Sequence, residues 1–149
     1  MSRVIALGQP AAGDDGVGPA VLAALREAGA PEGAELLSCA DPSGLIELLQ
    51  AEGPIVLVDA ALGERPGEVL TLSAGALALQ APASFSSHGL GVGQAIAIAR
   101  ELAPGAVPEQ LHLVAVTIAR PCMPGPGLSA EVAAALPAAA ERVRALLAG

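Results

Sequence analysis

The stretch Leu7-Gly8-Gln9-Pro10-Ala11-Ala12-Gly13-Asp14-Asp15-Gly16-Val17-Gly18 decides the fold. It follows the apolar run Val4–Leu7, which predicts a buried strand, and it precedes a segment whose apolar side chains have helical spacing. The Gly-rich turn between the two carries adjacent carboxylates, Asp14 and Asp15. In open α/β sheets, ligands bind where strands end and helices begin. The sequence therefore predicts a candidate site at this turn.

The chemistry of this turn favours a cation over a phosphate. A phosphate often binds between a strand and a helix N-terminus, but this turn matches neither G-x-G-x-x-G nor a P-loop. The carboxylates of Asp14 and Asp15 would also repel an anion. Two interpretations stay open: one of the two aspartates is a cation ligand, or it only caps the helix while the glycines form the turn.

Composition limits the classes of function. The 149 residues predict one domain, residues 1–149, with a single core. The formal net charge is −8 and only 1% of the residues are aromatic, which argues against nucleic-acid binding. The sequence has no apolar run long enough to cross a bilayer, and its N-terminus does not resemble a signal peptide. The spacing of Cys39 and Cys122 is unlike that of metal ligands. Because no secretory signal is recognised, a reducing cytoplasm is the expected compartment.

The order of elements predicts an α/β fold: a single three-layer domain with a mostly parallel five-stranded sheet and helices on both faces. One strand, residues 68–73, alternates apolar and polar side chains and is expected at an antiparallel edge. Pro137 lies within the apolar stripe of the last helix and is expected to kink it. Strands are predicted at 4–8, 34–39, 55–60, 68–73 and 110–118, and helices at 16–28, 45–49, 90–102 and from 129 onward.

Two further polar residues follow the strand and turn pattern. Asp59 comes at the end of the fully apolar run 55–58, and His88 stands at the start of the predicted helix 90–102. With Asp14 or Asp15, they form a plausible set of three ligands for a divalent metal such as nickel or zinc. A structural role is open for both, since Asp59 can accept backbone hydrogen bonds. His112 lies mid-strand and is interpreted as a strand residue rather than a ligand.

Four stretches together resemble a known family. Residues 6–18, 56–60 and 86–91 resemble the three signatures of the hydrogenase maturation proteases, and residues 127–132 resemble the start of that family's last helix. The resemblance implies a cytoplasmic, nickel-dependent endopeptidase. Such an enzyme removes the C-terminal extension of a nickel-iron hydrogenase large-subunit precursor after nickel insertion.

The same resemblance assigns the site residues. It implies that Asp15, Asp59 and His88 are the catalytic residues and recognise the metal. The nickel is expected to be carried by the substrate, and another divalent metal can replace it in vitro. The chain departs from the family pattern at three places: Asp15 stands where the family often has Glu, Gln9-Pro10 replaces the usual Asn, and no acidic residue lies near Ala119.

Three alternatives remain open at the level of sequence. A nucleotide-binding module would use Asp41, which follows the second strand where a ribose-binding acid lies in such folds. A cysteine-dependent hydrolase would pair Cys122 or Cys39 with His88. A non-catalytic relative on the same fold would bind a hydrogenase subunit or act as a metal sensor.

Overall fold

A five-stranded sheet forms the centre of the protein. The computed structural model describes residues 2–8, 16–39, 44–73, 92–118 and 128–148. The strand order is β2-β1-β3-β5-β4, and the first four of these strands are parallel, whereas β4 is antiparallel to β5 at the edge. The predicted fold class is confirmed. The strands are β1 (Ser2–Leu7), β2 (Ala34–Cys39), β3 (Ile55–Leu62), β4 (Val69–Ser73) and β5 (Leu111–Ile118).

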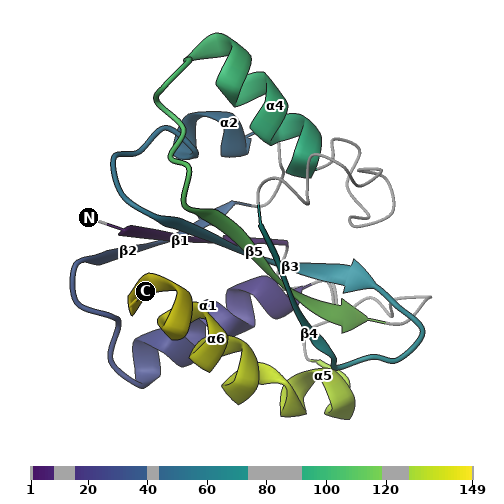
Figure 1. The fold of residues 1–149 in the computed structure, drawn as a ribbon. Helices are drawn as coiled ribbons and strands as arrows, with labels where there is room; N and C mark the ends of the chain where they lie inside the picture. Colours follow the sequence, from purple (N-terminus) through teal and green to yellow (C-terminus); the bar gives the residue numbers. More distant parts are fainter. Residues whose placement is uncertain (1, 9–15, 40–43, 74–91, 119–127, 149) are drawn as a thin grey trace.

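Helices cover both faces of this sheet (Figure 1). On one face lie α1 (Val17–Glu27), α5 (Ala130–Ala134) and α6 (Leu136–Ala148). On the other face lie α2 (Leu45–Leu48) and α4 (Val92–Leu102). None of the helices in the described part of the chain combines the length and the apolar character needed to cross a membrane.

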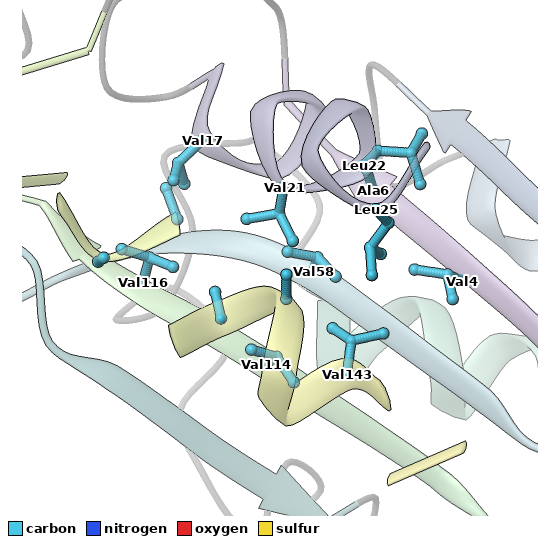
Figure 2. Close-up of a cluster of buried hydrophobic side chains, with 14 of the residues drawn as sticks. Val4, Ala6, Val17, Val21, Leu22, Leu25, Val58, Val114, Val116 and Val143 are labelled. Atoms are coloured by element: carbon cyan, nitrogen blue, oxygen red, sulfur yellow. The ribbon is translucent and has the colours of Figure 1, made fainter. Parts of the chain in front are cut away.

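Alternation along the strands divides the buried apolar side chains into two clusters. In β3, Val56 and Val58 belong to the cluster under α1 and α6, which we call the α1/α6 cluster and which Figure 2 shows. Ile55 and Leu57 belong to the cluster under α2 and α4, the α2/α4 cluster. The run Ile55–Val58 is apolar throughout because β3 is central and buried on both faces.

Several boundaries differ from the sequence prediction. Strand β3 continues two residues beyond the predicted end, to Leu62, because β5 still pairs with it there. Helix α1 ends at Glu27, one residue before the predicted end, and Ala28 is exposed. Asp41 lies outside the described residues, as does the predicted start of α4 at residue 90.

The last helix is divided in two, as Pro137 predicts. Helix α5 ends at Ala134 and α6 begins at Leu136. A proline at position 137 offers no backbone N–H, and its ring would clash with the carbonyl of Ala133 in a continuous helix. Ser129 occupies the predicted N-cap position, and its carbonyl accepts the Ala133 N–H at 2.9 Å, although its side chain makes no capping bond.

Candidate active site

Asp59 is buried at the carboxyl edge of the sheet, with 2% of its surface exposed. The prediction that it ends its strand is wrong, since it is the fifth of eight residues in β3. The pairing of β1 with β3 nevertheless stops one residue earlier, at Val58, whereas β5 continues opposite Asp59 with Ala115. Asp59 is therefore the first β3 residue beyond the end of the β1 pairing.

The carboxylate of Asp59 lies on the α2/α4 side of the sheet. Leu57 and Ala61, its neighbours on the same face of β3, both belong to the α2/α4 cluster. Burial of a charged group in such surroundings costs several kcal/mol unless hydrogen bonds or a cation compensate. One compensating bond comes from the Ala60 N–H, which donates to Asp59 Oδ1 at 2.8 Å. The structural role considered from the sequence is thus present, and it fixes the orientation of the side chain.

Gly18 brings the first turn of α1 against the end of β1 and the middle of β3. A Cβ atom at this position would lie 2.3 Å from the carbonyl oxygen of Leu7 and 2.9 Å from that of Val58. Only glycine permits this approach, because both neighbours are backbone atoms that cannot rotate away. The start of α1 therefore lies beside Val58, the residue before Asp59. The sequence presented Gly18 only as part of a Gly-rich turn, without this contact.

The other two predicted site residues, Asp15 and His88, lie outside the described residues, as does Asp14. Along the chain, Asp15 comes three positions before Gly18, and His88 comes four positions before Val92, the first residue of α4. Within the described ranges, no group of three or more His, Cys, Asp and Glu side chains could hold a metal ion. The three-residue metal site stays a prediction.

Thr117 is a buried polar residue near this edge that the sequence did not single out. Its hydroxyl accepts the Glu68 N–H at 2.8 Å and donates to the Arg65 carbonyl at 2.6 Å. Gly67 N donates to Thr117 O, and Thr117 N donates to Glu68 O, both at 2.8 Å. Gly67 and Glu68 thus lie opposite the single residue Thr117, and Gly67 has a φ of +89°. This is the geometry of a G1 β-bulge. Thr117 therefore holds the turn between β3 and β4.

The structure also places two residues of the competing interpretations. His112 is a half-buried residue of β5, opposite Val56, which confirms it as a strand residue. Cys39 ends β2, and β1 separates that strand from β3. The partners that the alternatives need, Cys122 and Asp41, lie outside the described part of the chain.

Comparison with known proteins identifies relatives of the whole domain. A family model described as hydrogenase maturation protease matches residues 22–145. Protein FrxA of Pyrococcus furiosus is 32% identical over 136 residues, which cover 91% of this chain and 96% of FrxA.

Solved structures agree with this match. The [NiFe] hydrogenase maturation protease HybD of Thermococcus kodakarensis has a TM-score of 0.79 at 25% identity, covering 98% of each chain. The hydrogenase-maturating endopeptidase HybD of Escherichia coli has a TM-score of 0.77 at 23% identity, covering 99% of this chain and 91% of that one. With a family model that matches most of its length and a fold shared along almost all of it, this chain belongs to the hydrogenase maturation protease family.

Proposed function

We propose that this protein is an endopeptidase that removes the C-terminal extension of a nickel-loaded hydrogenase large-subunit precursor. Asp15, Asp59 and His88 contact the nickel that the precursor carries. Membership of the protease family supports the reaction, and the placement of Asp59 supports the site. The cytoplasm, where the family resemblance locates such processing, is the proposed compartment.

The observation that carries the site is a buried carboxylate where the strand order changes direction. From β1 the chain proceeds to β2 on one side and to β3 on the other. Ligands of open α/β sheets bind in the crevice outside the carboxyl ends of two such strands. Asp59 is the first residue past the β1–β3 pairing, the position near which folds of this class bind ligands, and this supports the proposal. Its carboxylate oxygens are suitable ligands for a divalent metal.

The other two candidates, Asp15 and His88, each come a few positions before a described residue that packs near Asp59 or its strand. Asp15 precedes Gly18 by three positions, and Gly18 approaches the Val58 carbonyl too closely for a side chain. His88 precedes Val92 by four positions, and Val92 belongs to the α2/α4 cluster on the face of Asp59. Four residues of extended chain span about 13 Å. These short separations support the proposal that Asp15, Asp59 and His88, from three separate segments of the chain, act as ligands together.

The role of these residues is recognition and orientation. A divalent metal polarises a neighbouring carbonyl or activates a water molecule, and in this proposal the metal arrives with the substrate. Asp59 is held in one orientation by the Ala60 N–H and by its packing, so it needs little reorganisation when it binds. Because the ligands complete their shell only on a nickel-loaded precursor, cleavage depends on prior nickel insertion.

The test is cleavage of purified precursor, with and without nickel, by the wild type and by single variants. We expect Asp15→Asn, Asp59→Asn and His88→Gln each to lower kcat/KM by about 100-fold or more, since each removes a ligand that contributes several kcal/mol. Asp14→Asn and His112→Gln are matched controls, which we expect to stay within about threefold of the wild type. Thermal unfolding of every variant separates loss of the site from loss of the fold.

Two results would contradict the proposal. Normal cleavage by folded Asp15→Asn and His88→Gln variants would remove the assigned site. Tight binding of nickel-loaded precursor by the wild type without any cleavage would instead favour the non-catalytic relative.

A further inference from the structure

We infer that the outer edge of β4 binds the C-terminal extension of the precursor as an added strand; this inference rests on the proposed function. Strand β4 is the last in the order β2-β1-β3-β5-β4, so β5 occupies only one of its sides. In the ranges that the structure describes, no strand pairs with the other side. Extended peptides bind such edges through backbone hydrogen bonds, with side-chain contacts adding specificity.

The composition of β4 is unusual for an edge. Proteins generally protect exposed edges from pairing with charged residues, proline or bulges. Val69–Ser73 contains no charged residue and no proline, and all five residues pair regularly with β5. The bulge at Gly67 and Glu68 comes before this segment and does not interrupt it. Within the described ranges, an edge that lacks these protective features is suited to accept another strand.

The hydrogen-bond pattern shows which backbone groups face outward. The Glu68 carbonyl accepts the Thr117 N–H of β5, so the backbone groups of Glu68 face inward. Facing directions alternate along an antiparallel strand. The backbone groups of Leu70 therefore face β5, whereas those of Val69 and Thr71 face the open side. A peptide would pair with these two residues.

Side chains beside the edge provide apolar and charged contacts. Leu70 lies on the same face of β4 as Leu72 and is 39% exposed, which leaves an apolar surface for a residue of the added strand. On the other face, Arg142 Nη1 of α6 donates to Thr71 Oγ1 at 2.7 Å. This places a cation beside the edge in a chain of net charge −8, where it can pair with a carboxylate of an added strand.

The register connects this edge to the proposed site. Asp59 lies opposite Ala115, and Ala115 lies opposite Leu70, so the three form one row across the sheet. An added strand continues this row at about 14 Å from Asp59, three strand spacings of about 4.8 Å each. About four residues of extended chain cover that distance. A peptide bond cleaved near Asp59 can thus be followed by a segment paired with β4.

The test compares Thr71→Pro with Thr71→Ala. Both variants lose the Arg142 contact, but only proline removes the outward N–H, and an edge strand tolerates proline where the N–H faces solvent. On nickel-loaded precursor with its full extension, we expect KM of Thr71→Pro to be about tenfold above that of Thr71→Ala, with kcat within twofold. A tenfold change corresponds to about 1.4 kcal/mol, the size of one backbone hydrogen bond.

A second substrate makes the test specific. On a precursor whose extension is shortened to three residues, no segment reaches β4, so both variants should have the same KM. Equal KM values on the full-length precursor would overturn the inference. A difference that persists on the shortened one would also overturn it, since the proline would then act on the site through the sheet.

Hydrogen exchange of the wild type covers the case in which Thr71→Pro does not fold. A synthetic peptide with the sequence of the extension should slow exchange at Val69 and Thr71, whereas Leu37 on the opposite edge strand β2 stays unchanged. Absence of slowing at saturating peptide overturns the inference. Two wild-type chains could instead pair with each other through β4. Slowing at the same amides that depends on protein concentration and needs no peptide would show this dimer, and it would also overturn the inference. If the wild type does not cleave nickel-loaded precursor, the proposed function fails, and the peptide measurement still reports on the edge.

Discussion

Gly18 determines how close α1 comes to the end of β1 and to Val58 in β3. Its missing side chain lets the helix touch two carbonyl oxygens that a Cβ atom would meet at 2.3 and 2.9 Å. The same contact places the first turn of α1 beside Val58, the residue before Asp59. One residue thus sets the packing of α1 against both strands.

Gly18→Ala should lower the free energy of unfolding by about 2–3 kcal/mol, because backbone atoms must shift to admit the methyl group. Gly29→Ala is the matched control at the other end of α1. Its φ is +89° with nothing within 4 Å of the added Cβ, so only conformational strain of about 1 kcal/mol opposes it. Urea denaturation measures both. A loss at Gly18 no larger than at Gly29 would show that the helix can move away at little cost.

At this scale the sequence predicts the identity of Asp59 but not its exact place. A carboxylate after four apolar residues requires a hydrogen-bonding or charged partner, and the sequence alone shows this pattern. The sequence does not show that β3 continues to Leu62, because the pairing with β5 joins residues more than fifty positions apart. The close approach at Gly18 is equally non-local. The pattern of strands and turns indicated His88 and the pair Asp14 and Asp15, and the family resemblance selected Asp15 and gave these residues their roles.

Among the elements, the β3–β4 turn depends on one side chain of β5. Thr117 is 5% exposed, and its hydroxyl bonds to both Glu68 N and Arg65 O. This fixes the bulge from which β4 begins, and it sets which β4 residues face outward. The antiparallel β4 was predictable from alternation alone, but the bulge was not, since it depends on this distant threonine.

Thr117→Val should lower the free energy of unfolding by about 1–3 kcal/mol, because it leaves a backbone N–H and a carbonyl without their partner. Thr117→Ser keeps the hydroxyl and should cost less than half as much. Chemical denaturation at neutral pH distinguishes them. If the two variants lose equal stability, the methyl group of Thr117 contributes as much as its hydrogen bonds.

For the molecule as a whole, the two ends of the sheet differ in role. At the amino end, Arg3 Nε pairs with Glu35 Oε1 at 2.9 Å, and Arg3 Nη1 donates to the carbonyls of Leu48 and Gln50 at 2.9 and 3.3 Å. Arg3 thus ties β1 to β2 and to the segment after α2. At the carboxyl end lie Asp59 and the start of α1. The layer architecture was predictable from the alternation of elements, because parallel strands must bury both faces.

Arg3→Met should lower the free energy of unfolding by about 1–2 kcal/mol through the lost hydrogen bonds, with kcat and KM of cleavage unchanged at a temperature where the variant is folded. Glu35→Gln removes only a half-exposed ion pair and should cost less than about 1 kcal/mol. Thermal unfolding and the cleavage assay together check this. A changed KM in folded Arg3→Met would show that the amino end also contacts the precursor.

The two apolar clusters have no side chain in common. Residues adjacent in the chain, such as Leu57 and Val58, therefore pack against different side chains, because the sheet separates the two clusters. Substitutions in the α1/α6 cluster can accumulate without altering the side chains of the α2/α4 cluster around Asp59. Homologues can in this way diverge widely in one half while the other half keeps its chemistry.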